Sequence, residues 1–331
     1  MNVLKKKTKK IKANNYITLS AVLRAKESKL LTREQIERMV SEPGFAEACR
    51  IAAEAGYADM AGEDAAGINA ALEARYAHEL EDIRDLVPDK SLLRLLCLQY
   101  DCHNAKVLVK SGGETESGVY SENGCYSVEE LKTVYDAEDE NGELPEIFAE
   151  ALRAAKTALA RTGNPQLSDY LLDKAYFETL RAEAASTGRP YYMGYVRNRI
   201  DKVNLRSLLR TLEMGKRGEL LANALVEGGS IEIDQIRDPA LTREDVLRLY
   251  STTIFARASE AEDMTAFEKA ADNAELEELG GGSLIAFGPE VVLEYFAALE
   301  NEIMALRIIL TGKRMGLGAD ALRERLRESY V

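Results

Sequence analysis

The sequence offers little material for acid-base, nucleophilic or metal chemistry, and its two histidines show why. His78 follows Arg75 by three positions, and His103 follows Tyr100 by the same interval. Neither pair has the Glu-x-x-His spacing of a di-iron helix bundle, and the sequence contains no His-Glu-x-x-His zinc helix. Because histidine is the residue most often used as a general acid or base, this composition predicts no catalytic residue.

The four cysteines do not form a recognisable metal or disulfide framework. They are Cys49, Cys97, Cys102 and Cys125. Cys97, Cys102 and His103 could gather on one helical segment as a thiolate site, but their spacing is not that of a zinc motif. A buried cysteine commonly acts as a small apolar side chain. We therefore predict reduced, buried thiols, and neither a metal nor a cofactor.

Two glycine-containing segments resemble nucleotide-binding loops only superficially. A phosphate loop built on Lys313 would need glycine and Ser or Thr where this chain has Arg307 and Arg314. Residues 280–283, Gly-Gly-Gly-Ser, follow an acidic helix-like stretch and not a strand. They predict a hinge or a loop.

The composition fits a folded, water-soluble protein that does not bind nucleic acid. The 331 residues are 46% hydrophobic and 30% charged, with a formal net charge of -13. This hydrophobic content is enough for a substantial core, and the acidic balance disfavours nucleic acid as a partner. The sequence has no signal peptide and no apolar run of the about 18 residues that a membrane span needs. We expect a cytosolic protein, peripheral if it works at a membrane.

The N-terminus differs from the rest in charge. Residues 1–15 form a basic extension that precedes the first apolar periodicity at about Tyr16. Two interpretations are open for it: a solvated tail, or contact with anionic lipid headgroups or an acidic partner. Its lysines are Lys5, Lys6, Lys7, Lys9, Lys10 and Lys12.

Apolar residues recur at intervals of three and four positions, and Ala, Leu, Glu and Arg are abundant. This pattern predicts α-helices, whereas few segments alternate as strands do. Capping-box sequences predict helix starts after Thr32, Ser127 and Thr242. We therefore expect an all-α fold.

The chain repeats itself with a period near one hundred residues, which is informative about architecture. Residues 100–106 match residues 200–206 and, more loosely, residues 301–307; each has an acid and then a cation five positions later. Leu72-Glu73 likewise matches Leu172-Asp173 and, more weakly, Phe267-Glu268. The residues that recur in the acid-to-cation segments are Asp101, Asn104, Lys106, Asp201, Asn204, Arg206, Glu302 and Arg307.

Prolines keep the same order around these segments. Pro88, Pro190 and Pro289 precede the three acids by 13, 11 and 13 residues, which predicts that proline opens the same helix three times. We expect three helical repeats, at residues 16–112, 113–217 and 218–331. The chain starts and ends partway through a repeat, so terminal helices that pack together would close a roughly three-fold body.

The ordered motifs resemble those of the C subunit of the bacterial and archaeal V/A-type ATPases, which is similar to the d subunit of eukaryotic vacuolar ATPases. The resemblance runs from about Tyr16 to Val331 and is carried best by residues 30–32, 100–106 and 172–176 and by Ile200-Asp201 with Asn204. None of these motifs is an active-site signature. The chain departs from the pattern in its lysine-rich start and in Ala305, which stands where the other repeats have asparagine.

The resemblance implies a funnel of three similar helical domains on the cytoplasmic face of the membrane proteolipid ring. Such a protein would receive the foot of the central stalk and transmit torque without catalysing a reaction. The eight recurring residues would then serve packing between repeats, helix caps or surface pairs, or some of them would line the cavity that receives the stalk.

Two rival functions remain. The first is a free-standing helical-repeat scaffold that binds a peptide or protein, which contact between the terminal helices would reject. The second is a helical enzyme with a metal or radical cofactor, for which two poorly placed histidines are weak material.

Overall fold

The computed structural model describes residues 11–42, 44–116, 119–137, 140–215 and 218–328. Lys5, Lys6, Lys7, Lys9 and Lys10 lie outside these residues, whereas Lys12 lies within them. The described residues form helices joined by turns and loops, and contain no strand, which confirms the predicted all-α class.

The α-helices are α1 (Ile17–Glu27), α2 (Arg33–Ser41), α3 (Phe45–Glu54), α4 (Ala65–Arg84), α5 (Lys90–Lys110), α6 (Val128–Asp136), α7 (Glu146–Thr162), α8 (Pro165–Thr187), α9 (Pro190–Met214), α10 (Glu219–Ala224), α11 (Ile233–Ile236), α12 (Arg243–Tyr250), α13 (Ala256–Ser259), α14 (Met264–Leu279), α15 (Pro289–Arg314) and α16 (Ala319–Arg325). Two 3-10 helices, η1 (Ala13–Tyr16) and η2 (Gly280–Leu284), precede α1 and α15.

The three predicted capping boxes form as expected. The hydroxyls of Thr32, Ser127 and Thr242 each accept a hydrogen bond of 3.2 Å from the backbone N–H three residues later, at the starts of α2, α6 and α12. The side chain at that later position bonds back to the cap residue's own N–H in each case. These reciprocal bonds satisfy donors that the first helical turn leaves without partners.

The predicted proline starts hold for two of the three long helices. Pro190 and Pro289 are the first residues of α9 and α15. Pro88 lies outside α5, because Asp89 takes the N-cap and its carboxylate accepts a 3.0 Å hydrogen bond from the backbone N–H of Ser91. An acidic cap displaces the proline from the first turn there, since a capping side chain stabilises a helix start more directly than a fixed φ does.

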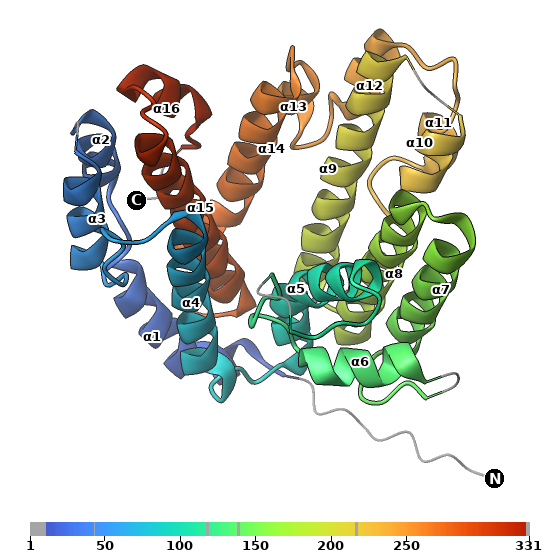
Figure 1. Cartoon of the computed structure of the whole chain (residues 1–331), viewed down its shortest axis with the longest axis horizontal. Helices are drawn as coiled ribbons and strands as arrows, with labels where there is room; N and C mark the ends of the chain where they lie inside the picture. The colour runs from blue at the N-terminus through green and yellow to red at the C-terminus, as the bar shows by residue number, and fades with distance from the viewer. Residues whose placement is uncertain (1–10, 43, 117–118, 138–139, 216–217, 329–331) are drawn as a thin grey trace.

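Helices from the two ends of the sequence pack against each other. Figure 1 shows α1 to α4 beside α15 and α16 on one side of the molecule, with α7, α8 and α9 on the other. The long helix α15 contacts α1, α2, α3 and α4, and α16 contacts α2. The described chain therefore closes on itself.

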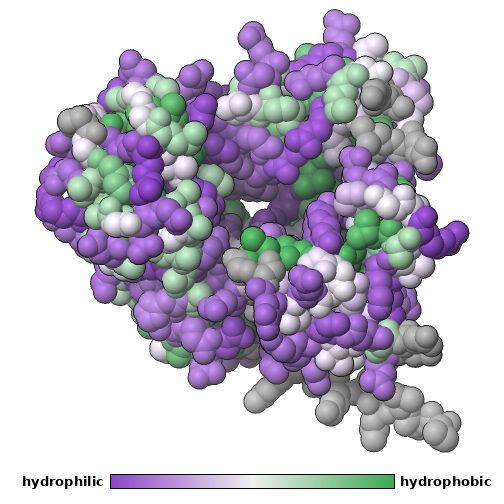
Figure 2. Space-filling model, viewed as in Figure 1, coloured by the Kyte–Doolittle hydropathy of each residue, from purple (hydrophilic) through white to green (hydrophobic). Residues whose placement is uncertain are grey.

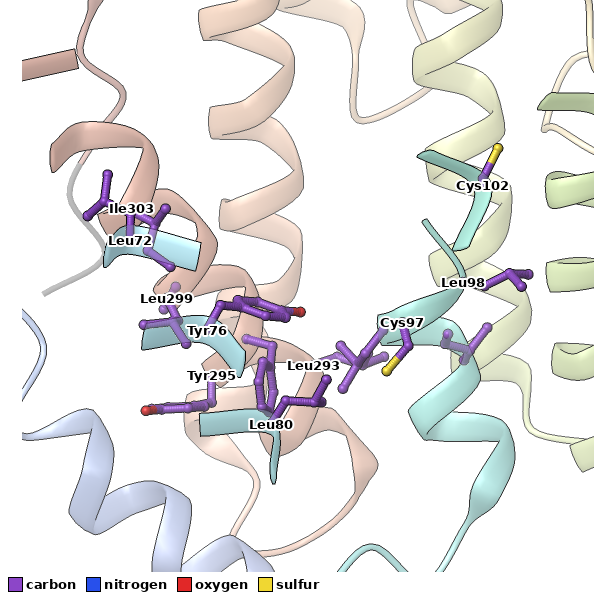
Figure 3. Packing of buried hydrophobic residues seen from close by; sticks show 14 of the residues in the cluster. Leu72, Tyr76, Leu80, Cys97, Leu98, Cys102, Leu293, Tyr295, Leu299 and Ile303 are labelled. Atoms are coloured by element: carbon purple, nitrogen blue, oxygen red, sulfur yellow. The ribbon is translucent and has the colours of Figure 1, made fainter. Parts of the chain in front are cut away.

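Buried apolar side chains form two cores. The larger runs through α1 to α9 and α15, and the smaller joins the end of α9 to α10, α11, α12, α13 and the first half of α14. Figure 3 shows part of the larger core, where Leu72, Tyr76 and Leu80 of α4 face Tyr295 and Leu299 of α15. Close-packed interiors of this kind resist compression.

Among the described residues, none of the helices is both long and apolar enough to cross a bilayer.

Candidate functional site

In α5, the predicted pair Asp101 and Asn104 binds the loop that leads into α6. The Asp101 carboxylate accepts backbone N–H bonds from Cys125 (3.0 Å) and Tyr126 (3.1 Å). The Asn104 side chain accepts from the backbone N–H of Ser121 and donates to its carbonyl oxygen, both at 2.8 Å. Both side chains are fully buried, so these bonds satisfy groups that would otherwise be costly to desolvate.

In α9, Asp201 and Asn204 bind the following loop in the same way. Asn204 donates to the carbonyl oxygen of Val226 and accepts from its backbone N–H, both at 2.8 Å. Asp201 accepts a 2.7 Å hydrogen bond from the backbone N–H of Ser230. A Cβ on Gly229 would come within 2.3 Å of the Asp201 carboxylate, so this close approach requires glycine.

The third acid, Glu302 in α15, binds a segment from the other end of the sequence. Its carboxylate accepts hydrogen bonds from the backbone N–H of Leu31 and from the Tyr57 hydroxyl, the latter at 2.7 Å. Leu31 directly precedes the N-cap of α2, just as Tyr126 directly precedes the N-cap of α6. Glu302 therefore anchors the start of α2, as Asp101 anchors the start of α6, although α2 lies about 270 residues before Glu302 in the sequence.

The three predicted cations each form an ion pair with a matched acid on another helix. Lys106 of α5 pairs with Asp173 of α8 at 2.5 Å, and Arg206 of α9 pairs with Glu268 of α14 at 2.7 Å. In α15, Arg307 pairs with Glu73 of α4 at 3.0 Å. All six side chains are partly exposed, so each pair contributes about 1 kcal/mol or less to stability.

Burial sets the electrostatics of the three acids. It raises the pKa of Asp101 to about 7, against the opposing effect of the two backbone N–H groups that the carboxylate accepts. Burial likewise raises the pKa of Asp201 and of Glu302. None of these carboxylates has a lysine or arginine as its hydrogen-bond partner, so the backbone and a tyrosine hold them in place.

Three further residues meet between the long helices, and they were not predicted from the sequence. Arg199 donates to the side-chain oxygen of Gln99 at 2.8 Å, and Gln99 donates to the Glu300 carboxylate at 2.7 Å. Each of these residues lies two positions before one of the recurring acids. Their common position, two residues before each acid, could have pointed to them in the sequence. The three side chains differ in type, however, so they did not resemble a motif.

A cavity of about 540 Å³ lies beside this hydrogen-bonded chain. Its walls come from α5, α9, α14 and α15, and Figure 2 shows the hollow near the middle of the molecule, with hydrophilic and hydrophobic surface around it. Apolar and aromatic side chains share the lining with charged ones. The residues that line it are Leu96, Pro190, Tyr191, Gly194, Tyr195, Asn198, Arg199, Lys202, Asp272, Glu275, Leu276, Glu278, Leu279, Leu293, Phe296, Ala297, Glu300, Asn301 and Met304.

Charges in the cavity wall are partly paired. Lys202 bonds the carboxylates of Asp272, at 2.6 Å, and Glu275. Burial opposes ionisation of Asp272, but Lys202 and Arg327 together hold the pKa of this carboxyl below its usual range. The acids in the lining outnumber the cations by four to two.

None of the eight recurring residues belongs to the cavity lining. They bind loops or pair helices, whereas Arg199 and Glu300, together with residues of α14, line the cavity. The arrangement separates two sets of side chains: one joins helices and loops, and the other lines the cavity.

The arrangement offers little for chemistry on a substrate. Among the described residues, no three His, Cys, Asp or Glu side chains lie close enough together to bind a metal ion. The cysteines are free thiols, and burial raises the pKa of Cys49 to about 11 and that of Cys102 above its usual value. Neutral thiols are poor nucleophiles and poor metal ligands.

The family model for the ATP synthase (C/AC39) subunit matches residues 19–325. The C subunit of the V-type sodium ATPase of Enterococcus hirae is 22% identical over 330 residues, covering 95% of this chain and 99% of that protein. The C subunit of the A-type ATP synthase of Haloquadratum walsbyi is 23% identical over 352 residues, with the same coverage of each chain. The chain therefore belongs to the ATP synthase (C/AC39) subunit family.

Proposed function

We propose that this chain is a non-catalytic rotor subunit of a V/A-type rotary ATPase. It couples the central stalk to the membrane proteolipid ring, and so transmits torque between ATP hydrolysis or synthesis and ion transport. It works on the cytoplasmic side of the membrane as a peripheral protein. The observation that carries this proposal is the family match, which spans all three acid-to-cation segments.

The pattern of ion pairs supports a body of three similar units that form a closed ring. Each pair joins the cation of one predicted repeat to an acid at a matched position in the next, and the third pair returns to the first repeat through Arg307 and Glu73. We propose the units at residues 16–112, 113–217 and 218–331, with α1, α2 and α3 packed on the third. A closed ring deforms less under load than an open stack of helices.

Closure also argues against the rival scaffold. An open-ended helical repeat keeps its terminal units apart and caps each with a polar face. Here α16 packs on α2, and Arg323 of α16 forms an ion pair with Glu37 of α2.

The cavity is the proposed seat of the central stalk. It lies between long helices from different predicted repeats, and it combines aromatic walls with a surplus of carboxylates. The lysines at the N-terminus, from Lys5 to Lys12, are proposed to contact anionic lipid at the membrane surface.

The test is a binding experiment with the purified chain and detergent-solubilised membranes that contain the ATPase. The expected result is recovery of both the proteolipid and the central-stalk subunits, identified by mass spectrometry. Recovery of neither would contradict the coupling role.

Two neighbouring glutamates of α14 provide a matched pair of variants for the stalk site. Glu278 lines the cavity, whereas Glu277 is also exposed but does not line it. Glu278→Arg should weaken stalk binding about tenfold or more by placing a cation in the acidic wall, while Glu277→Arg should bind normally. If the two variants bind the stalk equally well, the cavity is not part of the stalk-binding site. That result does not bear on binding to the proteolipid ring.

A further inference from the structure

The middle of α14 lies between the two cores and packs little apolar surface into either. Phe267 and Ala271, in the first half of the helix, are buried in the smaller core, and Leu279, at its end, is buried in the larger one. None of the residues from 272 to 278 is fully buried. The helix stands between α9 and α15 and contacts both (Figure 1). The position of its middle therefore depends largely on polar contacts.

The residues that follow α16 supply several of those polar contacts. The Arg327 guanidinium donates a 2.8 Å hydrogen bond to the Asp272 carboxylate. The backbone N–H of Glu328 donates a 3.0 Å bond to the side-chain oxygen of Asn273. The carbonyl oxygen of Glu328 accepts a 2.9 Å bond from the side chain of Asn301 in α15. This segment therefore joins α14 to α15.

The segment itself is well anchored. Leu326 is buried in the larger core. The Arg327 side chain is only 13% exposed, and it also donates a 2.9 Å hydrogen bond to the carbonyl oxygen of Arg325, the last residue of α16. These contacts hold the guanidinium in one orientation, so its bond to α14 costs little further side-chain entropy. We call residues 326–328 the clasp.

Both helices that the clasp joins contribute to the cavity wall. Asp272 and Asn301 line the cavity, and they accept from Arg327 and donate to Glu328, respectively. Lys202 of α9 pairs with one oxygen of the Asp272 carboxylate at 2.6 Å, and Arg327 pairs with the other at 2.8 Å. Asp272 is therefore held between a cation of the cavity wall and a cation of the clasp.

We propose that the clasp sets the width of the cavity, and that Arg327 is a positioning residue for the stalk site, acting through Asp272. Arg327 does not itself line the cavity. Without its guanidinium, one oxygen of the Asp272 carboxylate loses its partner, and this carboxylate is held only from α9. The consequence for the stalk rests on the function proposed above, whereas the effect of the clasp on α14 does not.

Hydrogen exchange of the full chain, followed by mass spectrometry, tests the clasp without any partner. Arg327→Ala should speed the exchange of residues 272–279 about tenfold, because it removes a hydrogen bond between charged groups. Exchange in α12, which belongs to the smaller core, should not change. Arg327→Lys keeps a cation near Asp272 and should recover most of the protection.

Arg325→Ala is the matched control for this experiment. Arg325 lies two residues before Arg327, and its side chain is exposed. Within the described part of the chain, this side chain has no hydrogen bond or ion pair. The control variant should therefore exchange like the unmodified chain.

The binding experiment with detergent-solubilised membranes tests the consequence for the stalk. Arg327→Ala should weaken binding of the central-stalk subunits about fivefold, since a residue outside a site can change affinity by this amount through the walls of the site. Arg327→Lys and Arg325→Ala should bind nearly as the unmodified chain does.

Three results of the exchange experiment would overturn the clasp: unchanged exchange of residues 272–279 in Arg327→Ala, an equal increase in α12, or the same increase in Arg325→Ala. An equal increase in α12 would show a general loss of stability and not a local release of α14. Failure of the proposed stalk site gives a different result. Exchange would then rise locally in Arg327→Ala, while this variant and Glu278→Arg both bind the stalk normally.

Discussion

Asp101 of α5, Asp201 of α9 and Glu302 of α15 each bind a separate segment of the chain, and we call these contacts the first, second and third junctions. The first two junctions use different side chains from the third. In α5 and α9, an aspartate and an asparagine bind the loop that follows in sequence. In α15, a glutamate binds Leu31 and Tyr57, and Ala305 stands at the asparagine position. The comparison teaches that the acid is the part common to all three junctions, while the amide is used only where the chain itself continues into the bound loop.

The largest expected effect concerns the third junction, where the two parts are far apart in sequence. Glu302→Ala leaves the buried N–H of Leu31 and the hydroxyl of Tyr57 without their partner, so the free energy of unfolding should fall by about 4 kcal/mol. Denaturant unfolding measures the loss, and hydrogen exchange should increase across α2 and α3. Tyr57→Phe, which removes one of the two bonds, should cost about 1 kcal/mol. Equal losses for the two variants would contradict the assigned role of Glu302.

A pH titration tests whether the first junction depends on a protonated acid. The folded pKa of Asp101 is about 7, above the unfolded value of about 4, so between these values the folded chain binds a proton that the unfolded chain has released. The stabilisation is therefore fully present below pH 4, and the unfolding free energy should fall by about 4 kcal/mol as the pH rises to 7.

The matched variant for this titration is Asp101→Asn. This variant should remove part of the dependence of the unfolding free energy on pH. The part that remains should come from Asp201 and Glu302, whose pKa values are raised as well. An unchanged slope in the variant would show that Asp101 is ionised throughout this range.

The amide of the second junction should matter less than the acid of the third. Asn204→Ala removes both hydrogen bonds to Val226 and should lower the unfolding free energy by about 2 kcal/mol in a denaturant titration. Asn198→Ala, on the same helix but in the cavity wall, should change stability by less than about 0.5 kcal/mol. A larger effect at Asn198 would contradict the division between joining and cavity-lining residues.

The smallest expected effects come from the cations. Lys106→Ala and Arg307→Ala each remove a partly exposed ion pair, and each should cost about 0.5 kcal/mol at low salt. Raising the ionic strength should reduce both costs, since exposed charges are screened. A loss above about 2 kcal/mol for Arg307→Ala alone would show that the third junction depends on this pair and not only on Glu302.

Local signals in the sequence were the most reliable. The capping boxes at Thr32, Ser127 and Thr242 formed because a cap needs only four consecutive residues. The all-α class followed from periodicity along each segment. The proline start failed at Pro88, where Asp89, a residue with stronger capping chemistry, lies next to it.

Features that depend on the packing of distant helices were not predictable. The chain of hydrogen bonds from Arg199 through Gln99 to Glu300 needs three helices to meet, and its side chains have no common type. Tyr57, a partner of Glu302, lies in a segment that no repeat matched. The cavity likewise arises from the angles between α9, α14 and α15, which the spacing of apolar residues does not specify.

The packing of α2 and α3 on α15 has a consequence for synthesis of the chain. These helices emerge from the ribosome before their partner α15, which follows about 250 residues later, after tens of seconds at usual rates of translation. Meanwhile the buried faces of Ile36, Met39 and Val40 have no partner from α15 to cover them. The packing of α2 and α3 is therefore completed only after α15 has been synthesised.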